Sequence, residues 1–77
     1  MNTFIIDFET DGLNPYHANI IEIGIKLCDV DKEYSTLIKI DKPLSEEIIS
    51  VTGITNENLI KNGIGKVAAY NGMLNFI

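Results

Sequence analysis

The sequence contains no arginine and no tryptophan, and it has one cysteine and one histidine. A single thiol, Cys28, cannot form an internal disulfide, which is typical of a protein from a reducing compartment. All six basic residues are lysines, so no guanidinium group is present to hold a phosphate through two parallel hydrogen bonds. The net charge of −5 argues against nucleic-acid binding by a basic surface, unless cations bound at an acidic site reverse its local charge.

Long hydrophobic runs are also missing. A membrane-spanning helix needs roughly 20 apolar residues, and Asp7 and Glu9 interrupt the first apolar run almost at once. The same two acids make a secretory signal a poor interpretation of the N-terminus. We therefore expect a cytoplasmic protein with no membrane partner. Its 77 residues allow one domain at most, and a hydrophobic content of 45% is typical of globular chains.

The pattern of apolar and turn-forming residues predicts strands first and helices afterwards. The expected strands cover residues 3–8, 20–29 and 33–40, and the expected helices cover residues 45–51, 56–61 and 66–77. The short connection between the second and third strands predicts an antiparallel meander. Ser45 and Thr55 are expected to cap the first two helices.

The last segment, KVAAYNGMLNFI, has the spacing of an amphipathic helix that is weakened by Gly72. Its apolar residues at intervals of three and four are expected to face the sheet, and they are Val67, Tyr70, Leu74 and Ile77. The order of elements gives an α/β chain in which three antiparallel strands precede the helices.

The stretch FIIDFETDGLNP, residues 4–15, carries Asp7 and Glu9 within a strand. Side chains alternate along a strand, so these two carboxylates point the same way, with Cα atoms roughly 6.5 Å apart. Oxygen ligands so placed suit Mg²⁺ or Mn²⁺, alone or as part of a pair of ions. The alternative interpretation is two solvated acids on an edge strand.

Four segments in order resemble the DEDD-type 3′–5′ exonucleases, a family that includes the proofreading epsilon subunit of DNA polymerase III and the oligoribonucleases. FIIDFETDGLNP resembles the first exonuclease motif of that family, and IIEIGIKL resembles its second strand. TLIKIDKPLSEEIISVTGITNENL resembles the third strand, the following helix and the Thr-Gly-Ile-Thr turn. The resemblance implies a truncated RNase H-like exonuclease fold, in which residues 1–77 form the N-terminal portion of a single domain.

The resemblance also implies roles for individual residues. Asp7 and Glu9 would be catalytic ligands of two divalent ions, Mg²⁺ or Mn²⁺. Thr10, Gly12 and Leu13 would lie along the 3′-terminal nucleotide, and Ile54 would press on its base. Ordinary packing is the alternative for Leu13 and Ile54, and Asp11, which replaces a second Thr of the motif, is better interpreted as a turn residue.

The family requires two more acids and a His or Tyr general base, and no such motif follows here. His17, the only histidine, is expected to be an ordinary loop residue. AYNGMLNF, residues 69–76, superficially resembles the second family motif, but Asn75 stands where the acid should be, and the periodicity favours a helix. We therefore expect this segment to be inactive alone. Because the family's first strand pairs on its far side with a later strand, the segment is also expected to expose an apolar edge.

The resulting functional expectation is a metal-dependent 3′–5′ exonuclease that hydrolyses the terminal phosphodiesters of DNA. Its expected partners are the 3′ end of single-stranded DNA and a DNA polymerase. Three alternatives remain at this point. They are an RNA-directed exonuclease of the same family, a non-catalytic module that binds a polymerase or a nucleic-acid end, and a small β-meander without a site.

Overall fold

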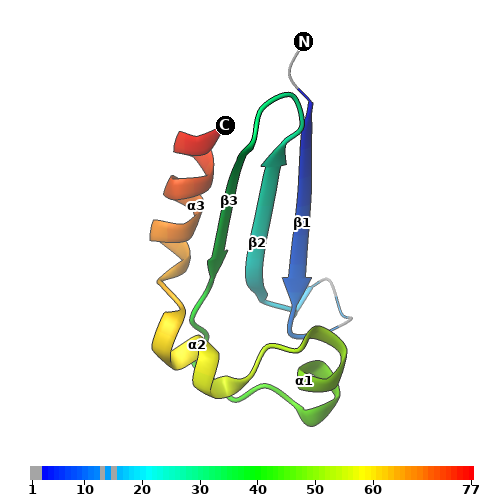
Figure 1. Ribbon diagram of the computed structural model, residues 1–77. Coiled ribbons are helices and arrows are strands. Elements are labelled where there is room, and N and C mark those ends of the chain that lie inside the picture. The colour runs from blue at the N-terminus through cyan, green and yellow to red at the C-terminus, as the bar shows by residue number, and fades with distance from the viewer. Residues whose placement is uncertain (1–2, 13, 15) are drawn as a thin grey trace.

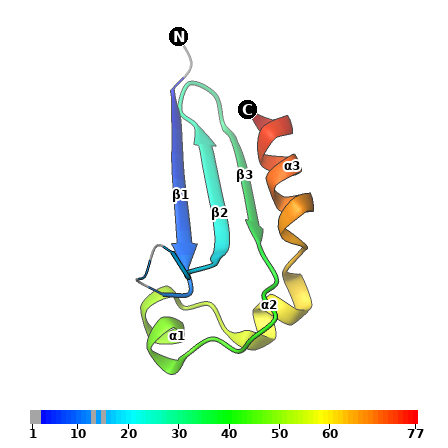
Figure 2. The same cartoon turned by 180° about the vertical axis from the view of Figure 1, so that it is seen from behind.

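The computed structural model describes residues 3–12, 14 and 16–77. The strands are β1 (Phe4–Thr10), β2 (Ile20–Leu27) and β3 (Lys32–Leu37), and the helices are α1 (Glu46–Thr52), α2 (Asn56–Asn62) and α3 (Lys66–Phe76). The strands form one antiparallel sheet in the order β1-β2-β3, so the predicted meander is confirmed. Helices α1 and α2 lie at the end of the sheet where β1 finishes, and α3 runs alongside β3 (Figure 1; Figure 2 shows the reverse side).

The strand ends differ from the predicted ones. β1 runs two residues past the predicted end, so that Glu9 and Thr10 belong to the strand. β3 ends at Leu37 instead of residue 40. Ile38 still donates its N–H to the Ile21 carbonyl of β2, but it also forms a parallel bridge with Ile64, in the segment before α3. The Lys39 N–H donates to the Ile64 carbonyl, and the Ile64 N–H donates to the Leu37 carbonyl. β2 also stops early, at Leu27, because a tight turn follows.

Helices α1 and α2 begin at the predicted caps. The hydroxyl of Ser45 accepts a hydrogen bond from the Ile48 N–H, and that of Thr55 accepts one from the Asn58 N–H. These bonds satisfy amide groups that have no partner within the helix. α1 ends at Gly53, whose φ of 75° is a left-handed conformation that favours glycine.

The core consists of two hydrophobic clusters. The first joins the start of β2 to the loops and helices at the end of the sheet, and its buried members are Ile21, Leu44, Ile54 and Leu59. The second lies between the sheet and α3, and its buried members are Ile23, Ile25, Ile38 and Ala69. The buried face of β2 consists of Ile21, Ile23 and Ile25, whose exposed fractions do not exceed 2%.

The predicted inward face of α3 is wrong for three of its four residues, because Val67, Leu74 and Ile77 are 68%, 66% and 58% exposed. Tyr70 is partly buried and packs against the second cluster, as predicted. The sheet is instead contacted by a stripe one position away, in which Ala69 is fully buried and Met73 and Phe76 are partly buried. The stretch from 69 to 76 is helical, in agreement with the preferred interpretation of AYNGMLNF.

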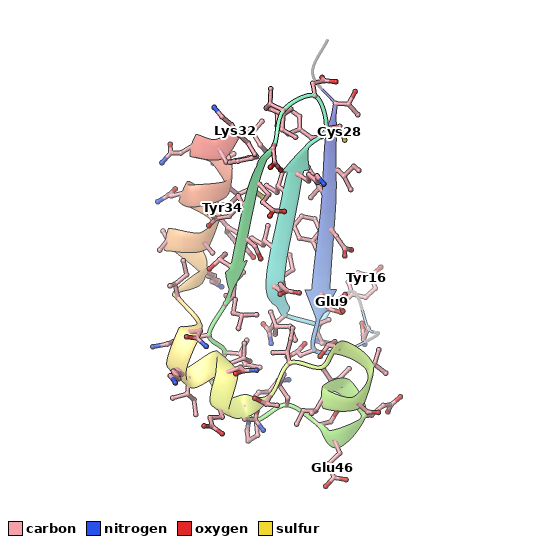
Figure 3. The ribbon with its side chains drawn as sticks, viewed as in Figure 1. Glu9, Tyr16, Cys28, Lys32, Tyr34 and Glu46 are labelled. Carbon is pink, nitrogen blue, oxygen red and sulfur yellow. The ribbon has the colours of Figure 1, made fainter. Side chains whose placement is uncertain are left out.

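Tyr34 explains this rotation of α3. Its hydroxyl donates a 3.0 Å hydrogen bond to the Ala69 carbonyl, so its ring lies between β3 and the helix (Figure 3). A Cβ atom on Gly72 would overlap the Tyr34 side chain. The small residues Ala69 and Gly72 therefore let the helix approach the sheet, and this contact outweighs the burial of Val67 and Leu74.

Among the residues that the model describes, no helix has the length and apolar character that crossing a membrane requires.

Candidate metal and nucleic-acid site

The two acids of β1 lie on the same face of the sheet. Asp7 stands opposite Gly24 of β2, and Glu9 stands opposite Glu22. We call this the acidic face, and its central residues are Asp7, Glu9, Glu22, Gly24 and Ser35. The other face, which carries Ile23, Ile25 and Tyr34 and packs against α3, is the helix face. The predicted alternation along β1 therefore holds, and neither acid points into the core.

Gly24 leaves the space beside Asp7 open. A Cβ atom added at Gly24 would meet nothing closer than the Asp7 carbonyl oxygen, at 3.9 Å. A shallow depression of about 250 Å³ begins at Asp7 and runs over Gly24 and Ser35 of the next two strands. A ligand that approaches the Asp7 carboxylate across the sheet therefore meets no side chain at the position directly opposite it, while Lys26 of β2 and Glu33 of β3 border the depression.

Glu22 is a third acid of this face that the sequence analysis did not single out. Burial raises the pKa of its carboxyl, and the negative charges of Glu9 and Asp7 raise it further. A group that is harder to ionise beside two other carboxylates indicates a locally negative potential, which a bound cation would relieve. The sequence IIEIG could have identified Glu22 as a surface acid. Because side chains alternate along a strand, an acid between two inward-facing isoleucines must lie on the face of the sheet away from the core.

The acidic face does not form a complete ligand cage by itself. Within residues 3–12, 14 and 16–77, no three His, Cys, Asp or Glu side chains lie close enough together to hold a metal ion. Asp7 and Glu9 provide carboxylate oxygens, which are the donors that Mg²⁺ and Mn²⁺ prefer. The residues therefore fit a divalent ion in chemistry, but further oxygen ligands would have to complete its shell.

The loop that follows β1 is closed by Asp11. Its carboxylate accepts hydrogen bonds from the backbone N–H and the side-chain amide of Asn19, at 2.6 and 2.9 Å, and its own N–H donates to the Asn19 carbonyl. Burial alone would raise the pKa of Asp11, but the Asn19 hydrogen bonds and the charge of Lys42 outweigh it, so the pKa lies below the ordinary value of 3.8. This geometry agrees with the interpretation of Asp11 as a turn residue.

Thr10 and Gly12 lie at the mouth of this loop, next to the C-terminal end of β1. The Thr10 hydroxyl donates a 2.9 Å hydrogen bond to the Gly12 carbonyl, which fixes the backbone just after Glu9. Figure 3 shows Glu9 at this end of the strand, with Tyr16 projecting from the loop beside it. Tyr16 is 90% exposed and is the most exposed large hydrophobic side chain of the described residues.

The other predicted residues differ in their surroundings. Leu13 lies outside the described residues. Ile54 is only 6% exposed and packs with Ile21, Leu44 and Leu59, so a contact with a base would require it to leave this cluster. His17 is an exposed loop residue, as predicted.

A larger hollow, of about 520 Å³, lies elsewhere, between the start of β2, residues 38–41 and the start of α3. It is lined by Lys39 and Lys66 and contains one carboxylate, Asp41. It includes neither acid of β1, and it has no second carboxylate beside Asp41. We therefore place the candidate site on the acidic face and not in the larger hollow.

Comparison with known proteins gives a family match over most of the chain. A family model described as an exonuclease, of the RNase T type, matches residues 4–71. The match includes all of β1 and β2 and both acids of the candidate site.

Two curated relatives also align with the chain, and both are described as DNA polymerase III of the PolC type. The protein from Thermotoga petrophila is 48% identical over 61 residues, and the protein from Thermotoga maritima is 46% identical over 61 residues. Each alignment covers 74% of this chain but only 4% of the relative. The chain thus corresponds to a small part of these polymerases.

Proposed function

Because the chain belongs to the exonuclease family, we propose that it forms the N-terminal, metal-binding portion of a 3′–5′ exonuclease domain that acts on DNA. The observation that carries the proposal is the placement of Asp7 and Glu9 on one open face of the sheet. The names of the two relatives favour DNA over RNA as the substrate and a DNA polymerase as the partner.

In this proposal Asp7 and Glu9 bind one or two divalent ions, Mg²⁺ or Mn²⁺. Such ions, when bound, would activate water for attack on a terminal phosphodiester and neutralise the developing charge. Gly24 leaves the position directly opposite Asp7 without a side chain, and Glu22 adds negative charge beside Glu9. Since the chain has no arginine, cations held here are also the means by which an acidic protein would attract a phosphate.

We further propose that the 3′-terminal nucleotide lies along Thr10 and Gly12, with Leu13 as a third contact. The bond from the Thr10 hydroxyl to the Gly12 carbonyl supports this placement, because it holds the backbone close to Glu9. For Ile54 we favour the alternative of core packing, because its side chain is 6% exposed within a hydrophobic cluster.

A second candidate function is a non-catalytic module that binds a polymerase or a nucleic-acid end. It is favoured by one observation, that the described residues bring no three metal-ligating side chains together. The two functions differ in whether the acidic face binds metal at all.

Calorimetric titration of the 77-residue chain with Mn²⁺ distinguishes them. We expect Mn²⁺ binding that Asp7→Asn and Glu9→Gln each weaken at least about tenfold, because each removes a charged oxygen ligand. Glu46→Gln, on the exposed surface of α1, is the matched control and should leave binding unchanged. Undetectable Mn²⁺ binding by the folded wild-type chain would favour the non-catalytic module.

Hydrolysis is tested separately, with 3′-labelled single-stranded DNA and RNA oligonucleotides of matched sequence. We expect the 77-residue chain to release no labelled nucleotide in Mg²⁺ or Mn²⁺, since two carboxylates do not complete a two-metal site. Metal-dependent release that Asp7→Asn abolishes would support the nuclease proposal and refute the claim that the segment is incomplete.

A further inference from the structure

One aromatic side chain of the protein stands apart from the core. The aromatic residues that pack against the second cluster are Phe4, Tyr34, Tyr70 and Phe76. Phe8 lies on the helix face of β1 and is 44% exposed. Tyr16 belongs to neither cluster and is 90% exposed, so packing among the described residues does not account for an aromatic ring at this position.

The backbone that carries Tyr16 is held in a defined turn. The side-chain oxygen of Asn14 accepts a 2.9 Å hydrogen bond from the Tyr16 N–H. The Asn14 carbonyl accepts bonds from the N–H groups of His17 and Ala18, at 3.1 and 2.8 Å. Asparagine commonly stabilises turns by bonding to the backbone two residues further on. The turn therefore fixes the backbone of Tyr16, while the ring itself points into solvent.

This turn lies beside the acidic face. Its base is closed by the hydrogen bonds between Asp11 and Asn19, just beyond Glu9. Tyr16 is three residues from Asn19, so its Cα atom lies at most about 11 Å from that closure. Figure 3 shows Tyr16 and Glu9 at the same end of the sheet. All of these hydrogen bonds belong to the loop between β1 and β2, so the place of Tyr16 depends on this hairpin alone.

We propose that Tyr16 is a nucleotide-binding residue of the acidic face, and that its ring stacks on an unpaired base next to the 3′-terminal nucleotide. The inference rests on the proposed function, because it takes the terminal nucleotide to lie along Thr10 and Gly12. Every base has a π-face, so stacking on an aromatic side chain holds a single strand with little regard to its sequence.

Stacking suits the charge of this protein. The net charge is −5 and arginine is absent, so the surface attracts phosphates weakly wherever no cation is bound. A neutral aromatic ring adds affinity for DNA without a basic side chain. Because the turn fixes its backbone and a tyrosine has only two side-chain torsions, Tyr16 loses little conformational entropy when a base stacks on it.

The proposal also specifies the form of the substrate. Inside a duplex, each base is paired and is stacked on its neighbours, and taking it out of the stack costs free energy. In a single strand, a base can turn its face to Tyr16 without breaking a base pair. We therefore expect the site to bind single-stranded ends in preference to blunt duplex ends.

Fluorine NMR of the 77-residue chain labelled with 3-fluorotyrosine tests the stacking directly. The chain has three tyrosines, and the Tyr16 signal is assigned by its loss in Tyr16→Phe. With Mg²⁺ and a tetrathymidylate, we expect the Tyr16 signal to shift. The signals of Tyr34 and Tyr70, whose rings pack against the second cluster, should stay in place.

An abasic strand of the same length is the matched control probe. It carries the same phosphates but no base, so we expect it to leave the Tyr16 signal where it is. An unchanged Tyr16 signal up to millimolar tetrathymidylate would overturn the proposal, as would an equal shift with the abasic strand.

Fluorescence anisotropy with a 5′-labelled thymidylate strand measures the effect on affinity. We expect Tyr16→Ala to raise the dissociation constant at least about fivefold and Tyr16→Trp to leave it unchanged or lower it. Val30→Ala is the control, at a 48% exposed position in the turn at the opposite end of the sheet (Figure 1). Equal affinities of Tyr16→Ala and the wild type would overturn the proposal, as would tighter binding of a blunt duplex.

Mn²⁺ titration of the same proteins separates this inference from the proposed function. A wild-type chain that binds Mn²⁺ but no thymidylate strand would overturn the stacking and leave the metal site intact. Binding of the strand that depends on Tyr16, in a chain that takes up no Mn²⁺, would support the stacking and contradict the metal site.

Discussion

At the scale of single residues, the electrostatics of the acidic face depend on Glu22 as much as on the two acids of β1. The sequence alone predicted that Asp7 and Glu9 share a face, because strand alternation is a local property. It did not predict that Glu22 stands opposite Glu9, because this pairing depends on the register between two strands. Register follows from the hairpin as a whole and cannot be derived from either strand separately.

Asp11 gives a prediction on pH dependence. Its pKa is lower in the folded chain than the ordinary 3.8, so its contribution to stability is present above that value and is lost as the pH falls through the folded-state pKa. We expect Asp11→Asn to lower the free energy of unfolding by about 1 kcal/mol at neutral pH, because it disrupts the hydrogen bonds from Asn19.

Urea unfolding of the wild type and Asp11→Asn, between about pH 7 and pH 2, measures this effect. The difference between the two proteins should shrink once the pH is below 3.8. Asp31→Asn, in the exposed turn between β2 and β3, is the control and should change the stability by less than about 0.5 kcal/mol. A difference that grows toward low pH would contradict the proposed role of Asp11.

At the scale of elements, the sequence was a good guide to where helices begin and a poor guide to which side of α3 is buried. Caps are local, so Ser45 and Thr55 could be identified from residue type and position. The orientation of α3 depends on how closely it approaches Tyr34, and this favours the small residues Ala69 and Gly72. Periodicity alone, which counts large apolar residues, selected the neighbouring stripe.

Gly72 therefore gives a test of this packing. Alanine has the higher helix propensity, by about 1 kcal/mol. We nevertheless expect Gly72→Ala to lower the free energy of unfolding by about 1–2 kcal/mol, because its Cβ atom would overlap the Tyr34 side chain and overpacking costs more than the propensity gains.

Chemical denaturation measures this change, and Asn71→Ala is the matched control, at the neighbouring exposed position of the same helix. Asn71→Ala should be neutral or slightly stabilising, because it gains helix propensity without a new contact. If Gly72→Ala stabilised the protein as much as the control did, the close approach of α3 to Tyr34 would be refuted.

At the scale of the whole molecule, the helices and the two acids of β1 occupy different parts of the sheet. The sheet positions both acids of β1 on a surface with no helix over it, whereas α3 and the end helices build the core elsewhere. The family could be recognised from the sequence because its first motif and the following segments are contiguous. The sequence also predicted an incomplete site, because no motif among the 77 residues matches the family's two further acids and general base, and this stays a prediction.

The most direct test of the central claim is paramagnetic broadening of amide signals in the NMR spectrum of the 77-residue chain by substoichiometric Mn²⁺. We expect the amides of Asp7, Glu9 and Gly24 to broaden first, those of α3 to remain sharp, and the effect to vanish in the Asp7→Asn/Glu9→Gln double variant. Broadening that begins at Glu46 and Glu47 of α1, or that persists in the double variant, would contradict a metal site on the acidic face.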